Sequence, residues 1–299
     1  MNLFITGATG YIGGSVATKL VAQGHRVRGL ARDSGKAGAL EALGIEPVVG
    51  DLDDGDLLAR EARAADGVVN AANADHVFSV QALLAAMEGS GKRLVHTSGS
   101  SVVGDDARGN VLSDKVYDED TAFVVTPAKQ ARHALNQMVL EAACRDVRTA
   151  VICPTLIYGT GRALNAHSIQ IPFLVEQARL RGAVAIVGSG ANRWSTVHID
   201  DLTDLYALVV TQPAAGGFYF AENGEVSHRA LGLAIAARLN LGAVASITAE
   251  DAARVWGEAR AFYTYGSNSR VHAKRARQEL GWKPHCSSVL HWIRDEMPI

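Results

Sequence analysis

The sequence lacks the features that mark secreted, metal-binding and membrane-spanning proteins. Its three cysteines (Cys144, Cys153 and Cys286) are scattered and odd in number, which predicts neither a disulfide framework nor a metal-binding spacing. No apolar run approaches the roughly 20 residues that a bilayer-crossing helix needs. The first residues already have the pattern of a strand, which leaves no room for a signal peptide. We therefore expect a cytoplasmic protein that holds no metal ion.

There is also no excess of charge of either sign. The chain has 29 Lys and Arg against 31 Asp and Glu, a formal net charge of −2, which gives no electrostatic reason to expect binding to nucleic acid or to an anionic membrane. Apolar residues make up 48% of its 299 residues and charged residues 20%, so we expect a globular protein with a sizeable core. The expected partner is a small-molecule substrate.

The amino-terminal stretch carries the strongest motif in the chain. Leu3–Ile5 predicts a buried strand, and the apolar spacing of Ser15–Gln23 predicts a helix. Gly7, Gly10 and Gly13 lie between them, in the strand–turn–helix setting of a dinucleotide-binding fingerprint. The first glycine permits a tight turn, the second lets a pyrophosphate approach the backbone, and the third lets helix and strand pack closely. A dinucleotide cofactor is therefore expected.

The end of the second predicted strand, His25–Ala31, indicates which dinucleotide is bound. An acidic residue there would accept hydrogen bonds from the adenosine ribose of NAD, but this chain has Ala31 followed by Arg32, with Lys36 shortly after. A guanidinium can hold a 2′-phosphate through two hydrogen bonds. We therefore predict NADP as the cofactor, while Asp33 keeps NAD as an alternative.

Strands and helices alternate up to about residue 160. Further strands are predicted over 48–52, 67–73, 93–97 and 147–153, with helices over 54–64, 75–88 and 127–143 and Asp53 as the cap of the first of these helices. This alternation predicts an α/β fold, a parallel sheet doubly wound by helices as in the Rossmann fold. Cofactor contacts are expected where strands end, with Asp51 at the adenine and the small Ala71 and Ala72 along the cofactor's path.

The strict alternation ends near Gly161. We assign residues 1–160 and 191–220 to a dinucleotide-binding Rossmann domain, and residues 161–190 and 221–299 to a smaller, interleaved α/β substrate region. Past that point we predict a helix over 168–181, a strand over 184–187, a helix over 202–210, a return to the main sheet at 217–220, and helices that follow Ser227 and Thr248 and begin at Lys274.

With these pieces placed, the chain resembles the extended short-chain dehydrogenase/reductases, the family of nucleotide-sugar epimerases and dehydratases. The resemblance covers essentially the whole length and rests on the glycine motif, Gly50–Leu52, Pro154–Gly161, Val197–Asp201 and Leu280–Pro284. Together with the strand-end argument it implies a cofactor site formed by Thr6, Gly7, Thr9, Gly10, Tyr11, Ile12, Gly13, Arg32, Lys36, Asp51, Leu52, Ala71, Ala72, Thr97 and Pro154. It also implies a homodimer formed through the helices over 75–88 and 127–143.

The sequence departs from this family at the catalytic positions. The family has a Tyr and a Lys four residues apart on the helix after strand five, and a Ser or Thr after that strand. Here Ala128 stands at the tyrosine position, Arg132 at the lysine position and Gly99 at the serine position, and no Tyr-x-x-x-Lys occurs anywhere. The chain therefore resembles an atypical subgroup that keeps the glycine motif but lacks the Ser-Tyr-Lys catalytic residues.

Another group must then handle the proton if the chain is a reductase. Tyr158 is the first candidate, because its loop follows strand six at the carboxyl edge of the sheet. A shift of one residue in the alignment would restore Ser98 or Ser100. His133 and Tyr117 are further candidates. Proton donation typically contributes about 10²–10⁴-fold, so a different donor could leave useful activity.

The predicted substrate side differs from that of nucleotide-sugar enzymes. The family's diphosphate-binding arginine usually lies four residues before His198, where this chain has Trp194, with Arg193 one residue upstream. Trp194 and His133 are the predicted substrate contacts, and the tryptophan suggests an apolar or aromatic substrate. The leading hypothesis is an NADP-dependent oxidoreductase acting on a ketone, enone or imine. A non-catalytic NADP(H) sensor and a nucleotide-sugar epimerase or dehydratase are the alternatives.

Overall fold

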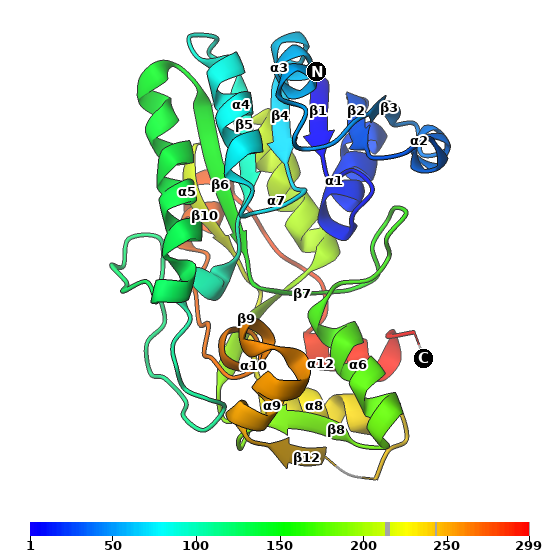
Figure 1. Cartoon of the computed structure of the whole chain (residues 1–299), viewed down its shortest axis with the longest axis vertical. Helices are drawn as coiled ribbons and strands as arrows, with labels where there is room; N and C mark the ends of the chain where they lie inside the picture. The colour runs from blue at the N-terminus through cyan, green and yellow to red at the C-terminus, as the bar shows by residue number, and fades with distance from the viewer. Residues whose placement is uncertain (213–215, 243, 299) are drawn as a thin grey trace.

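Seven parallel strands form the central sheet of the protein. The computed structural model describes residues 1–212, 216–242 and 244–298, and within them the strand order is β10-β6-β5-β4-β1-β2-β3 (Figure 1). The bounds are β1 (Asn2–Thr6), β2 (Arg26–Ala31), β3 (Glu46–Val49), β4 (Gly67–Asn70), β5 (Arg93–Thr97), β6 (Arg148–Pro154) and β10 (Gly217–Ala221). The predicted return of the chain to the main sheet is confirmed, because Gly217 pairs with Ala150 in parallel register.

Helices cover both faces of this sheet. One face packs against α1 (Tyr11–Ala22), α7 (Ile199–Thr211) and α11 (Lys274–Leu280), which bury Leu20, Leu205 and Leu280 in one apolar core. The other face packs against α3 (Gly55–Ala64), α4 (Val77–Met87) and α5 (Gln130–Glu141), which bury Leu58, Leu83 and Leu135 in a second core. The sheet is therefore doubly wound, and the predicted Rossmann-type α/β class is confirmed.

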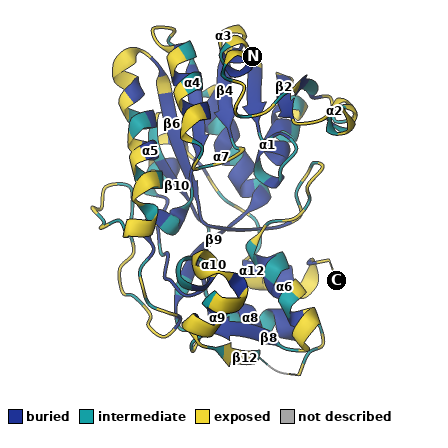
Figure 2. Ribbon diagram, viewed as in Figure 1, coloured by how far each residue is buried: buried dark blue, intermediate teal, exposed yellow. Residues whose placement is uncertain are grey.

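A smaller region lies below the main sheet in Figure 1 and has its own core (Figure 2). It contains a three-stranded sheet of β7 (Leu156–Tyr158), β9 (Arg193–His198) and β11 (Glu225–Ser227), and a two-stranded sheet of β8 (Val184–Val187) and β12 (Val244–Ile247). Its helices are α6 (Gln170–Arg181), α8 (His228–Arg238), α9 (Ala249–Trp256), α10 (Glu258–Tyr263) and α12 (Val289–Asp295). The residue boundaries that we predict between the Rossmann domain and the smaller substrate region stay a prediction. Helix α11 belongs to the range 221–299, which we assign to the smaller region, but it packs on the main sheet.

Several element boundaries differ from the predictions for local reasons. Helix α1 begins at Tyr11 rather than Ser15, because Gly13 and Gly14 belong to the helix. They let its first turn pack closely against the backbone of Gly7 and Ala8. Helix α3 is capped by Asp54 rather than Asp53, since the Asp54 carboxylate accepts from the Leu57 amide at 2.9 Å. These differences move ends by one to four residues and leave the order of elements unchanged.

Three helices were not predicted. Helix α2 (Ser34–Glu41) contains two glycines and buries only Leu40, so its apolar pattern is weak. Helices α10 and α12 are six and seven residues long, too short to give a clear helical period. No helix in the part of the chain that the structure describes is long and apolar enough to cross a membrane.

Candidate active site

Two glycines at the turn between β1 and α1 have no room for a side chain. Gly7 has a φ of +74°, and a Cβ on it would lie 2.6 Å from the Ala71 carbonyl oxygen at the end of β4. A Cβ on Gly13 would lie 2.4 Å from the Gly7 carbonyl oxygen. The Gly10 amide donates to that same oxygen at 2.8 Å. The turn therefore stays tight, and the start of α1 is held directly beside it.

A cleft of about 530 Å³ opens where this turn meets the carboxyl ends of the strands. Nine of the predicted site residues share its wall: Gly10, Tyr11, Ile12, Ala71, Ala72, Ser98, Ser100, Pro154 and Trp194. Ligands of open α/β sheets bind in such a crevice at the carboxyl ends of the strands. The cleft is therefore the candidate active site.

Other predicted cofactor residues lie next to the cleft rather than in its wall. The Thr6 hydroxyl donates to the Asn70 side chain, and the Thr97 and Tyr206 hydroxyls are 2.6 Å apart. Both threonines are buried, so they brace the strand ends. Asp51 is exposed at the exit of β3 and accepts from the Asp53 amide at 2.8 Å. Leu52 packs against the core beside it, and Thr9 is half-buried in the glycine turn. Their contact with a cofactor stays a prediction.

The basic residues after β2 have distinct surroundings. The Asp33 carboxylate caps α2, accepting from the Lys36 amide at 2.9 Å, and the Lys36 ammonium lies 3.7 Å from the same carboxylate. Arg32 is exposed and has no hydrogen bond or ion pair with any described residue. The Asp33 carboxylate is therefore used as the cap of α2, whereas the Arg32 guanidinium has no partner among the described residues.

Tyr158 is not placed where a proton donor to the cleft would have to be. Its hydroxyl donates to the Ser287 carbonyl oxygen, and its ring packs against His198 with centroids 5.2 Å apart. The side chain is fully buried in the core of the smaller region, because β7 turns away from the main sheet after Pro154. Burial also raises the pKa of its hydroxyl. This placement does not support the predicted role.

His133 and Tyr117 also lie outside the cleft wall. The His133 ring meets the edge of Phe123 at 5.8 Å, and Phe123 packs on Tyr117 at 5.9 Å. The two predicted residues thus belong to an aromatic group beside α5. The predicted contact of His133 with substrate has no support in this arrangement.

The two predicted serines do reach the cleft. The Ser98 hydroxyl is buried and has no hydrogen-bond partner among the described residues. The Ser100 hydroxyl accepts from that of Ser269 at 2.8 Å. Behind them, His96 is buried, and this burial, assisted by the charge of Arg132, lowers its pKa to about 4. The histidine is therefore neutral near pH 7 and acts as a structural polar group.

Arg132, which we predict at the lysine position of the family, is neutralised by a carboxylate. Its Nε donates to an Asp75 oxygen at 2.7 Å, a second guanidinium nitrogen donates to the other oxygen, and a third reaches Ser101 at 3.3 Å. The hydrogen bonds from Arg132 hold the pKa of the Asp75 carboxyl below its usual range. This pair fixes α5 against the start of α4.

Lys129 is a cleft residue that the sequence reasoning missed. It follows Ala128 at the start of α5, and its ammonium lies 5.6 Å from the centre of the Tyr263 ring. It has no hydrogen-bonding or ion-pair partner in the described residues. Burial, with the nearby charge of Arg132, lowers the pKa of this lysine. Its position next to the predicted tyrosine site was the only signal in the sequence.

Trp194 lines the cleft although it lies far in sequence from the glycine turn. Its indole donates to the Ser267 carbonyl oxygen at 2.9 Å, and Tyr265 beside it donates to the Gln170 carbonyl oxygen at 2.9 Å. Arg193 is held by Glu225 at 2.8 Å. The arginine next to the predicted diphosphate position is thus already neutralised.

Metal-ligand side chains gather near the start of α7, outside this cleft. His198, Asp200 and Cys286 bring possible ligand atoms within 4.8 Å of one another. Asp200 is bound by Arg162 through two hydrogen bonds of 3.0 and 2.6 Å, and His198 accepts from the Asp200 amide at 3.1 Å as the cap of α7. His198 and Asp200 therefore have structural roles, His198 as the cap of α7 and Asp200 as the partner of Arg162.

Comparison with known families identifies the family of the chain as a whole. Residues 3–219 match the NAD dependent epimerase/dehydratase family. The chain belongs to this family. The match spans the glycine turn, the central sheet up to β10 and all but the last residues of the cleft wall.

Curated relatives of this epimerase/dehydratase-family chain include oxidoreductases. An oxidase named ucsJ from Acremonium sp is 34% identical over 325 residues, which cover 95% of this chain and 92% of the relative. A 4-hydroxy-2-methyl-3-oxo-4-farnesyl-3,4-dihydroquinoline-1-oxide ketoreductase from Stigmatella aurantiaca is 28% identical and covers 75% of this chain and 69% of the relative.

Solved structures show how widely the family fold is shared. DesIV, a dTDP-glucose 4,6-dehydratase from Streptomyces venezuelae with NAD bound, has a TM-score of 0.77 at 21% identity, over 99% of this chain and 98% of that one. At this identity the likeness shows the fold alone.

Proposed function

We propose that the protein is an NADP(H)-dependent oxidoreductase that reduces a small carbonyl, enone or imine substrate, with a lysine as the proton donor. The observation that carries this proposal is the cleft itself, where the bare glycine turn faces an ammonium group that no described residue neutralises. The ketoreductase and oxidase relatives support the reaction class. The bound cofactor would supply hydride at its nicotinamide ring.

The residues of the cleft fit a dinucleotide. Gly7 and Gly13 have no room for a side chain, so the backbone of the turn can come close to a pyrophosphate, which the first amides of α1 would hold. Ala71 and Pro154 leave an open path toward the nicotinamide end. The exposed Arg32 would bind a 2′-phosphate, since the carboxylate of the next residue, Asp33, caps the start of α2. This arrangement favours NADP over NAD.

Lys129 is the group that we assign to proton transfer. When hydride reaches the substrate carbon, the ammonium donates a proton to the substrate oxygen or nitrogen and becomes a neutral amine, which water in the open cleft reprotonates. A lowered pKa makes the ammonium a better acid. Arg132 stays charged beside it and is held by Asp75, so it would orient the substrate rather than exchange a proton.

The test is oxidation of NADPH by the purified protein in the presence of ketones, enones and imines, with NADPH affinity measured by calorimetry. We expect micromolar binding of NADPH, weaker binding of NADH, and turnover with at least one substrate class. Tight NADPH binding without oxidation by any of the compounds would contradict a reductase. It would favour the non-catalytic NADP(H) sensor, which the absence of Tyr-x-x-x-Lys supports.

A nucleotide-sugar epimerase has weaker support. Solved relatives such as MoeE5 are described with UDP-glucose and NAD, but Trp194 replaces the predicted diphosphate-binding arginine and Arg193 is paired with Glu225. Binding of a UDP-sugar at micromolar concentration would restore this alternative.

We also propose a homodimer formed through α4 and α5. These helices pack side by side on one face of the sheet, and Val77 and Phe78 at the start of α4 are 43% and 49% exposed. Sedimentation of the protein and of a Phe78→Glu variant tests this proposal: a dimer that the variant leaves intact would contradict it. A cytoplasmic location stays a prediction.

A further inference from the structure

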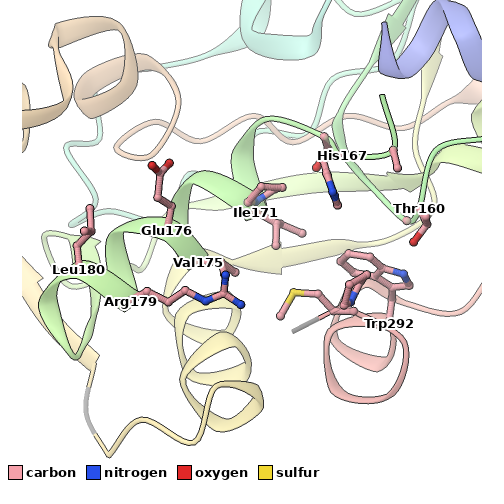
Figure 3. Close-up of a pocket in the computed structure, with 14 residues that line it drawn as sticks. Thr160, His167, Ile171, Val175, Glu176, Arg179, Leu180 and Trp292 are labelled. Carbon is pink, nitrogen blue, oxygen red and sulfur yellow. The ribbon is translucent and has the colours of Figure 1, made fainter. Parts of the chain in front are cut away.

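A second hollow of about 600 Å³ lies between α6 and α12, outside the cofactor cleft (Figure 3). Its walls are mainly apolar: Ile171 and Val175 project from α6, and Trp292 and Met297 close the opposite side. Ile171, Trp292 and Met297 are all buried. The charged Glu176 and Arg179 also line the pocket and are exposed, and the Arg179 side chain extends toward the side that carries Trp292 (Figure 3). The interior thus suits a hydrocarbon rather than a polar group.

This pocket and the cofactor cleft are adjoining. His167 and Ser168, in the loop that leads into α6, form part of both walls. Ile169, which lines the cleft, and Leu180, which lines the pocket, leave 74% and 75% of their surfaces exposed. A hydrocarbon bound along α6 would cover both side chains and gain from their burial. The apolar lining therefore continues from the reaction cleft along α6.

We propose that this pocket binds the hydrocarbon tail of the substrate, so that the substrate class is a carbonyl compound with a long alkyl chain. This inference rests on the proposed reductase function. The carbonyl would lie in the cleft near Lys129, and the chain would pass His167 and Ser168 into the pocket between α6 and α12. The tail would then supply binding energy that the small, partly open cleft does not provide.

The charges argue against a nucleotide as the occupant. A diphosphate needs several donors or cations. Among its charged side chains the pocket has Arg179, whose positive charge is offset by the negative charge of Glu176. A hydrocarbon needs neither, and it would cover Leu180 and the faces of Val175 and Trp292. Burial of each methylene gives about 0.8 kcal/mol, which corresponds to about fourfold in affinity.

The experiment uses a series of straight-chain methyl ketones with the intact protein and NADPH. We expect kcat/KM to rise up to about fourfold for each added methylene once the chain reaches the pocket, and then to level off. Leu180→Asp places a charge at the pocket, and because Leu180 is exposed the variant should fold normally. It should lower kcat/KM at least about tenfold for the longest ketone and less than about twofold for the shortest.

Two comparisons make the result decisive. Leu233→Asp changes another exposed leucine, 51% exposed on α8 and outside both hollows, and should leave the chain-length dependence unchanged. Val175→Phe fills the pocket with hydrocarbon and should shorten the chain length at which the gain stops. Turnover that does not depend on chain length would overturn this inference and leave the proposed function standing. Failure of every ketone, enone and imine would instead overturn the proposed function.

Discussion

Replacing Lys129 by Gln is the sharpest test of the proposed chemistry. The amide has similar length but no acidic proton at neutral pH, and the ammonium that it replaces has no ion pair with any described residue to be broken. General acid catalysis contributes about 10²–10⁴-fold, and each factor of ten corresponds to about 1.4 kcal/mol of activation free energy. Since water in the open cleft can partly replace the donor, we expect a loss of about 10²-fold in kcat.

The pH dependence separates a proton donor from a merely positive group. Burial lowers the pKa of Lys129 from the usual lysine value, so the acidic form is lost as the pH rises through that lowered pKa. The kcat for ketone reduction should therefore fall on the alkaline side at a pH below the ordinary pKa of a lysine. Lys129→Arg keeps the charge but does not titrate in this range, so its profile should lack that decline while its rate stays low.

The assay is steady-state oxidation of NADPH from pH 6 to 10 with a saturating ketone, together with calorimetric measurement of NADPH affinity. Lys115→Gln removes an exposed lysine outside the cleft and is the matched control. Equal activity of Lys129→Gln and the control, or an alkaline decline that persists in Lys129→Gln, would refute the assignment of this lysine.

Three further predictions concern the cofactor and stability. Arg32→Ala should weaken NADPH binding about ten- to hundredfold and leave NADH binding nearly unchanged in calorimetry, because a hydrogen bond to a charged group contributes about 1.5–3 kcal/mol; equal effects on both cofactors would exclude a 2′-phosphate contact. Gly13→Ala should abolish cofactor binding and lower the Tm, since its Cβ would lie 2.4 Å from the Gly7 oxygen. Burial lowers the pKa of His228 from 6.5 to about 4, so as the pH falls the histidine is protonated in the unfolded state before it is protonated in the folded state. The contribution of His228 to the free energy of unfolding is therefore fully present above pH 6.5 and is lost as the pH falls toward 4. This amounts to about 2 kcal/mol between pH 7 and pH 5 in urea unfolding, and His228→Gln should lack that share.

The sequence was sufficient where an element carries its own boundary signals. Strands β5 and β8 have the predicted limits and helix α11 begins at the predicted residue, because apolar runs or a helical period are bounded by clear turn signals. The glycine turn was predictable for the same reason: its steric demands act within a few residues. Helix α2 was missed because two glycines and a single buried leucine give almost no pattern.

The cleft was harder to predict because its contacts join distant segments. The Arg132–Asp75 ion pair links residues 57 positions apart. The sequence could therefore indicate that Arg132 replaces the expected lysine, but not that Asp75 neutralises this arginine. Tyr158 follows the main sheet in sequence, yet a three-residue strand turns its side chain into the other core. The position of Lys129 depends on where α5 begins, and helix ends are the least certain part of a sequence-based prediction.

The strand order of the central sheet has a consequence for synthesis on the ribosome. Strand β6 is completed at Pro154, but its neighbour β10 is made only after the excursion through β7, α6, β8, β9 and α7. Until then β6 is a bare apolar edge that can pair with another nascent chain. Chains that stop before residue 217 should therefore aggregate, and co-expressed chaperones should raise the yield of full-length protein.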